Sequence, residues 1–233
     1  MNIELIVFDI AGTTLMDNGE IAESFQKALH EFGYTVPVVK INPLMGYKKP
    51  EAILKILEEF EHDIELIDQN YVNKIHKRFQ SIMVEYYRNT KELKALPYAE
   101  EIFEYLHSKG IKIGLDTGFS KEITDVIIDR LEWLKNGKID SYVCSDEVIM
   151  GRPHPYMINK IMNDLGVIDP NKVIKVGDTE VDVNEGFNAG CKYSIGITTG
   201  AFSEEELQKH LPSFIIHHLS ELVPIIHDSL TNE

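Results

Sequence analysis

The chain has 233 residues, of which 43% are hydrophobic, so it can bury a sizeable core in one or two domains. Its net charge of −15 argues against a nucleic-acid partner, because phosphate backbones require clustered lysine and arginine. No apolar run approaches the roughly 18 residues that cross a bilayer, and the first residues lack the pattern of a signal peptide. We therefore expect a soluble, cytoplasmic protein that acts on a small molecule and contacts neither nucleic acid nor membrane.

Short apolar runs rich in branched side chains predict the strands of a sheet. The first covers residues 3–8, later runs cover 111–116, 172–176 and 193–197, and a weaker one covers 214–216. Helical patterns lie between these runs. Strands that alternate with helices are typical of a parallel sheet covered on both faces, so we predict an α/β fold with a Rossmann-like core.

The stretch 17–92 has a different pattern. It contains no convincing strand but at least three apolar stripes at helical spacing. We therefore expect an α/β core domain, 1–16 plus 93–233, interrupted by an all-helical cap domain, 17–92. Such an insert begins at the carboxyl end of a strand, where open α/β sheets bind their ligands, and it can act as a lid.

Polar clusters follow three of the predicted strands, and a fourth precedes a helical pattern. Because the carboxyl ends of parallel strands meet at one edge of a sheet, these clusters should converge. Carboxylates that lie together repel one another unless a cation intervenes, and hard oxygen ligands suit Mg²⁺. The residues expected around this one spot are Asp9, Thr117, Arg152, Asp178 and Asp182.

The order Asp-x-x-Gly-Thr, Thr-Gly, Arg-Pro-x-Pro and Gly-Asp-Thr-x-x-Asp resembles the haloacid dehalogenase superfamily along the whole chain. Within it, the chain looks most like the phosphonoacetaldehyde hydrolase (phosphonatase) family and its near relatives. The segments that carry this closer match are 9–14, 45–49, 151–155 and 175–179. The resemblance implies a hydrolase that takes a phosphoryl group from a small organic substrate, with Mg²⁺ as cofactor.

The resemblance also implies roles for single residues. Asp9 would attack phosphorus and form an aspartyl-phosphate that water then hydrolyses. Asp9, Asp178 and the backbone carbonyl of Ala11 would hold Mg²⁺, while Asp182 would hold metal-bound water or orient its neighbours. Arg152 would balance charge on Asp9 and on the transferring group. The residues implied to bind the phosphoryl group or the substrate are Gly12, Thr13, Met45, Lys49, Thr117 and Gly118.

Ala11 is the most informative of these positions. Most phosphatases of the superfamily have an aspartate there, which protonates the leaving group, and alanine cannot do so. Phosphonatases instead use a lysine that condenses with the substrate aldehyde to an iminium ion, which accepts the electrons of the breaking C–P bond. Lys49 occupies the matching position in Met-Gly-x-x-Lys. Taken alone, a lysine between Lys48 and Pro50 is typical of a solvated helix start.

Two positions near Lys49 depart from the phosphonatase pattern. Ala52 stands where a histidine is expected, and Phe119 stands where a tyrosine is expected. A free lysine has a pKa of ~10.4 and is a poor nucleophile at neutral pH without such partners. Repulsion from the adjacent Lys48 offers one way to lower the pKa of Lys49.

Three functions remain open on the sequence. The first is C–P bond cleavage of phosphonoacetaldehyde or a related phosphonate through a Schiff base at Lys49. The second is hydrolysis of small phosphate monoesters, as in phosphoglycolate phosphatases, with another group in place of the missing acid. The third is a catalytically weak domain that binds a phosphorylated ligand. The chain is expected to be a monomer or a homodimer.

Overall fold

The computed structural model describes residues 3–61, 63, 65 and 67–231. Its sheet has six parallel strands in the order β3-β2-β1-β4-β5-β6. This arrangement confirms the predicted α/β fold, including the weak strand near the carboxyl end of the chain. The strands are β1 (Leu5–Asp9), β2 (Lys112–Thr117), β3 (Ser141–Cys144), β4 (Val173–Gly177), β5 (Tyr193–Ile197) and β6 (Phe214–Ile216).

Strand β3 was not predicted from the sequence. It is only four residues long, lies at the edge of the sheet and has two half-buried residues, so its apolar pattern is too short to stand out.

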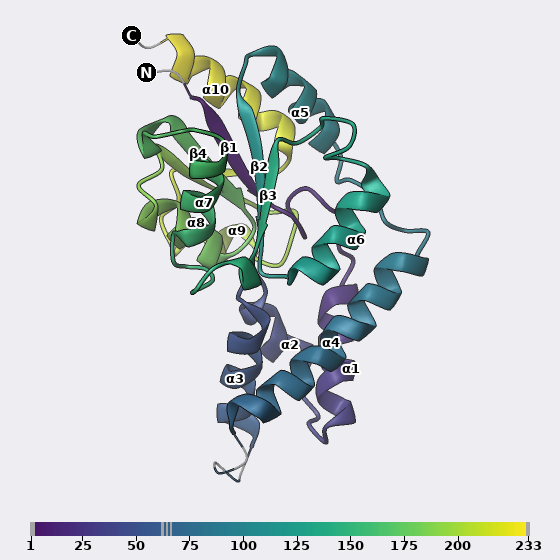
Figure 1. Ribbon diagram of the computed structural model, residues 1–233. Helices are drawn as coiled ribbons and strands as arrows, with labels where there is room; N and C mark the ends of the chain where they lie inside the picture. The colour runs from purple at the N-terminus through teal and green to yellow at the C-terminus, as the bar shows by residue number, and fades with distance from the viewer. Residues whose placement is uncertain (1–2, 62, 64, 66, 232–233) are drawn as a thin grey trace.

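Helices connect the strands and fill the segment between β1 and β2 (Figure 1). The α-helices are α1 (Glu20–Glu31), α2 (Val38–Ile41), α3 (Lys49–Phe60), α4 (Gln69–Asn89), α5 (Ala99–Ser108), α6 (Lys121–Leu131), α7 (Tyr156–Asp164), α8 (Glu180–Asn188), α9 (Glu204–Gln208) and α10 (Leu222–Thr231). Short 3-10 helices are η1 (Asn42–Leu44), η3 (Ser145–Glu147), η4 (Pro170–Lys172) and η5 (Leu219–Glu221). None of the helices in the described part of the chain is long and apolar enough to cross a membrane.

Both faces of the sheet are buried, as the near-continuous apolar runs of its strands require. In β1, Phe8 packs edge-to-face on Phe103 of α5, with ring centroids 5.7 Å apart. Val7 points to the other face and joins a cluster with Met157 and Ile161 of α7. Alternate residues of one strand therefore fix helices on opposite sides of the sheet.

The helices α1 to α4, here called the helical insert, form a body beside the sheet, below it in Figure 1. Its interior includes an edge-to-face contact between Phe25 of α1 and Phe79 of α4, with centroids 5.2 Å apart. Helix α4 packs along α6, and Gln80 donates a 2.7 Å hydrogen bond to Oγ of Ser120, just before α6. We propose that residues 17–92 form a cap domain on this core.

The two chain segments that join the insert to the core lie side by side. The amide of Met16 donates to the carbonyl of Lys94 at 3.1 Å, and the amide of Leu96 donates to the carbonyl of Thr14 at 2.8 Å. Because these bonds tie both segments together, the insert meets the core through a short two-stranded connection next to the end of β1.

Candidate active site

The loop after β1 holds Asp9 at the edge of the sheet. Asp9 is the last residue of β1, and the amides of Thr14 and Leu15 both donate to the carbonyl of Ile10, which turns the chain back sharply. Gly12 adopts a left-handed conformation, with φ of 84°, and a Cβ there would lie 2.8 Å from Oδ2 of Asp178. Glycine thus allows the loop after β1 to approach the loop after β4.

The loops after β2 and β4 end beside this turn. Thr117 is the last residue of β2, and its Oγ1 accepts a 3.1 Å hydrogen bond from the amide of Phe119. Gly118 meets the insert directly, because a Cβ there would lie 2.5 Å from the carbonyl oxygen of Tyr47 and 2.6 Å from that of Gly46. The backbone of the insert therefore contacts the core at the edge of the sheet where the strands have their carboxyl ends.

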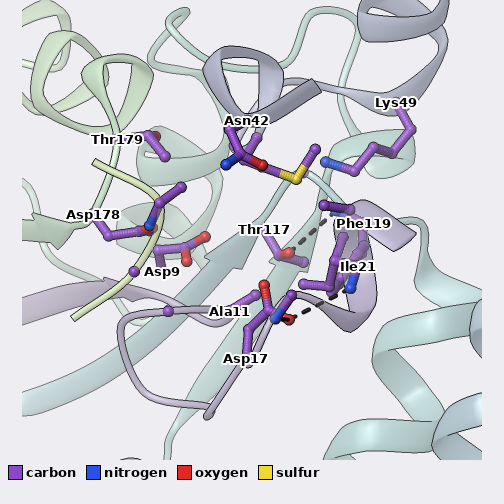
Figure 2. A pocket seen from close by; sticks show the side chains of 18 residues that line it. Asp9, Ala11, Asp17, Ile21, Asn42, Lys49, Thr117, Phe119, Asp178 and Thr179 are labelled. Atoms are coloured by element: carbon purple, nitrogen blue, oxygen red, sulfur yellow. Dashed lines mark hydrogen bonds between the residues drawn. The ribbon is translucent and has the colours of Figure 1, made fainter. Parts of the chain in front are cut away.

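A cavity of about 190 Å³ lies between these loops and the insert. Figure 2 shows Asp9 and Asp178 on one side of it and Lys49 with Phe119 on the other, with Thr117 between them. The predicted site residues that line it are Asp9, Ala11, Gly12, Met45, Lys49, Thr117, Gly118 and Asp178. Thr13, Arg152 and Asp182 are buried behind the lining residues.

Asp9 and Asp178 are the pair suited to a metal ion. Asp178 is 3% exposed; its Oδ2 accepts a 2.6 Å hydrogen bond from the amide of Ala201, and its Oδ1 accepts from Oγ1 of Thr13 at 3.4 Å. Burial and then the nearby charge of Asp9 raise the pKa of Asp178 well above its usual value. Burial disfavours the charge of both carboxyl groups, and a hard divalent cation bound by them would let both ionise.

A buried ion cluster stands behind Asp9. Arg152 is fully buried, and its Nη1 lies 2.7 Å from Oδ1 of Asp9 and 3.0 Å from Oδ1 of Asp182. Its Nε lies 3.2 Å from Oε2 of Glu185, and its Nη2 pairs with Asp116. Arg152 thus contacts the predicted nucleophile from inside the core, while its predicted contact with the transferring group has no counterpart in the cavity lining.

Lys175 completes the cluster from the middle of β4. Its ammonium pairs with Asp116 and lies 3.1 Å from Oδ1 of Asp182 and 3.4 Å from Oε2 of Glu185. Oxygen atoms of Asp9, Asp116 and Asp182 all lie within 4.8 Å of one another, as in a metal site. Arg152 and Lys175 already contact these carboxylates, so we assign the trio to the ion cluster rather than to a metal.

Asp182 has a second structural role. Its Oδ2 accepts hydrogen bonds from the hydroxyl and the amide of Thr179, the latter at 3.2 Å, which caps the start of α8. Oδ2 of Asp182 is therefore hydrogen-bonded within the protein, whereas its buried Oδ1 has only the ion-pair contacts with Arg152 and Lys175.

Lys49 is a buried residue of the cavity, which corrects the solvated position that its sequence neighbours suggest. It is 3% exposed, and its Nζ lies 5.7 Å above the ring of Phe119 and 3.5 Å from the carbonyl oxygen of Tyr47. Burial lowers the pKa of Lys49 to about 8, against the attraction of Asp9. Lys48 points elsewhere, since its Nζ donates to the carbonyl of Val148 at 3.3 Å.

Three ionisable residues of this region were not given roles from the sequence. Lys175 did carry a signal, because a lysine inside an apolar strand needs a buried partner. Glu185 lies on a helix with several polar residues, and Asp17 lies in a polar loop, so neither stands out in the sequence. Asp17 nevertheless lines the cavity.

The comparisons with known proteins bear directly on this arrangement. A family model described as haloacid dehalogenase-like hydrolase matches residues 6–196. The chain belongs to this family of hydrolases. It is 32% identical over 232 residues to phosphonoacetaldehyde hydrolase of Bacillus mycoides, covering 91% of this chain and 83% of that protein.

Two of the solved structures that share this fold cover nearly the whole chain. A phosphonoacetaldehyde hydrolase-like protein from Oleispira antarctica matches with a TM-score of 0.83 at 23% identity, covering 98% of this chain and 92% of that one. A hydrolase from Pseudomonas syringae matches with a TM-score of 0.84 at 17% identity, covering 97% and 98%. At these identities the two structures support the fold of this haloacid dehalogenase-like hydrolase.

Proposed function

We propose that this hydrolase cleaves the C–P bond of phosphonoacetaldehyde or a closely related phosphonate aldehyde. The observation that carries the proposal is the position of Lys49, a buried amine that lies across the cavity from Asp9. Two residues after Asp9 stands Ala11, which cannot protonate a leaving group. The similarity to phosphonoacetaldehyde hydrolases along most of the chain supports it.

The proposed reaction has two parts, which take place on opposite sides of the cavity. At one side, Lys49 in its neutral form bonds to the aldehyde carbon, and loss of water gives an iminium ion. At the other side, a carboxylate oxygen of Asp9 attacks phosphorus. The P–C bond breaks and its electron pair passes to the iminium, which gives an enamine. The enamine takes up a proton at the former phosphorus-bearing carbon and becomes an iminium again. Water then hydrolyses the aspartyl-phosphate to phosphate and the iminium to the free aldehyde and the Lys49 amine.

Each neighbouring residue has a separate task in this proposal. The hydroxyl of Thr117 and the amides after Asp9 bind phosphoryl oxygens, and Arg152 orients Asp9 from behind. Asp9, Asp178 and the carbonyl of Ala11 would hold Mg²⁺, which would supply positive charge to the phosphoryl oxygens.

The second candidate is a phosphatase that acts on small phosphate monoesters, because Ala52 and Phe119 bring no polar side-chain group to Lys49. Phosphate release measured with Mg²⁺ from phosphonoacetaldehyde and from small phosphate monoesters separates the two. Release from phosphonoacetaldehyde, with borohydride inactivation through Lys49, supports the phosphonatase. Monoester turnover that persists in Lys49→Ala, without release from phosphonoacetaldehyde, overturns it in favour of the phosphatase. Ligand binding without turnover would indicate a domain that only binds phosphorylated ligands.

A further inference from the structure

Asp17 brings a third carboxyl group to the cavity, in addition to those of Asp9 and Asp178. It lies on the segment that joins the end of β1 to the insert and lines the same cavity as Asp9 and Lys49. In Figure 2 one oxygen of Asp17 bonds to Ile21, while its other oxygen points into the cavity.

The local chain holds this carboxyl group in one orientation. Oδ1 of Asp17 accepts hydrogen bonds from the amides of Gly19 at 3.1 Å and Ile21 at 3.4 Å, a turn that precedes α1. Gly19 permits the turn with φ of 103°. Since both amide bonds go to the same oxygen, the turn fixes the direction of the other one.

Asp17 is also suited to hold a proton near neutral pH. Burial, followed by a hydrogen bond with the carboxyl group of Glu20, raises the pKa of Asp17 to about 6. Partial burial opposes the charged form of Glu20, but hydrogen bonds from backbone amides and the one with Asp17 outweigh it and lower the pKa of Glu20. Of the two carboxyl groups, Asp17 is therefore the one that favours the protonated form.

The proposed reaction at Lys49 needs a group in the cavity that can give and take protons. Among the described residues that line it, those that ionise are Asp9, Asp17, Lys49 and Asp178. Asp9 and Asp178 serve the phosphoryl side, and Ala11 offers no proton. Imine formation at Lys49 nevertheless requires protons to move to and from the carbonyl oxygen and the amine nitrogen.

We infer that Asp17 is the catalytic acid and base for the reaction of the substrate's aldehyde group with Lys49. This inference rests on the proposed function, because the reacting partner is the adduct at Lys49. As Nζ of Lys49 bonds to the aldehyde carbon, the carboxyl group of Asp17 gives its proton to the carbonyl oxygen. The resulting carboxylate takes one proton from the cationic nitrogen. It then returns this proton to the hydroxyl group, which leaves as water, while the nitrogen lone pair forms the iminium.

The decisive variant is Asp17→Asn. Asparagine keeps an oxygen that can accept from Gly19 and Ile21 but cannot carry the proton. The rate of borohydride-trapped labelling of Lys49 by phosphonoacetaldehyde, read by mass spectrometry, is expected to fall by about 100-fold or more, with phosphate release falling in parallel. Glu23→Gln removes an exposed carboxyl group from the first turn of α1 and serves as the matched control, with both rates within twofold of wild type.

Chemical rescue separates proton transfer from a structural role. Asp17→Gly leaves space for a small acid, so formate is expected to restore a concentration-dependent part of the labelling rate, whereas Asp17→Asn stays unrescued. Asp17→Asn with both rates within threefold of wild type overturns the inference, as does absence of Lys49 labelling in the wild type. Labelling that depends on Asp17 but releases no phosphate would leave the inference standing and refute the proposed function.

Discussion

Nη1 of Arg152 lies 2.7 Å from Oδ1 of Asp9, and the arginine side chain is completely buried. The proposed nucleophile is thus oriented by a cation inside the core, and it also lines the cavity. Positioning of Asp9 and folding of the core therefore depend on the same ion cluster.

Replacing Arg152 should cost more stability than replacing an exposed arginine. Arg152→Met leaves four carboxyl groups with only Lys175 as a cation among the described contacts of the cluster, so we expect a loss of about 3–5 kcal/mol in the free energy of unfolding. Urea unfolding measures it. The control Arg78→Met breaks a surface pair with Glu31 and should cost less than about 1 kcal/mol. Equal losses in the two variants would contradict the buried role.

Removal of the nucleophile should abolish turnover without unfolding the protein. Asp9→Asn keeps the size of the side chain but makes it a poor nucleophile, so phosphate release is expected to fall by about 10⁴-fold or more. Thermal unfolding provides the control for folding. Release above a tenth of the wild-type rate would refute the assignment of Asp9.

Of the predicted metal aspartates, Asp178 and Asp182 should behave differently toward Mg²⁺. The chelator EDTA is expected to stop phosphate release and added Mg²⁺ to restore it. Mg²⁺ should also raise the melting temperature of the wild type, because a ligand bound only to the folded state stabilises it. We expect Asp178→Asn to lose this shift. Asp182→Asn should keep it but melt at a lower temperature, because it loses charge pairing with Arg152 and Lys175. The reverse pattern would place the metal in the ion cluster.

The pH dependence of acetylation at Lys49 should follow the neutral fraction of its amine. Burial lowers its pKa to about 8, so its neutral amine increases as the pH rises through 8 and approaches its maximum above that value. At pH 7 about one molecule in ten would carry the neutral amine, compared with fewer than about one in a thousand for a lysine of ordinary pKa. Acetylation of Lys49 by acetic anhydride, which needs no proton from Asp17, measured by mass spectrometry from pH 6 to 10, tests this. A rise centred near pH 10 would show that Lys49 has an ordinary pKa.

The predictions from sequence succeed where local patterns dictate structure. Asp9, Thr117 and Asp178 each follow or end an apolar run, and parallel pairing of the runs brings them to one edge of the sheet. The exposure of Lys49 could not be read from the sequence, because it depends on how α3 packs against the loop at Phe119. The burial of Arg152 likewise depends on tertiary packing that its local sequence does not show.

Ion pairing across the fold was the other part hidden from the sequence. Lys175 and Glu185 are ten residues apart and belong to different elements, and only the packing of α8 on β4 brings their charges within 3.4 Å. The same holds for Asp17, whose direction depends on the turn before α1 and on the insert that closes the cavity above it.

The cavity of about 190 Å³ has a consequence for competition inside a cell. It is smaller than the ~300–1,000 Å³ of ordinary small-molecule pockets, so it favours compact compounds over nucleotides and long sugar phosphates. Selection by size of this kind would show as a drop in kcat/KM with carbon-chain length. It would also reduce competition from the larger phosphorylated metabolites.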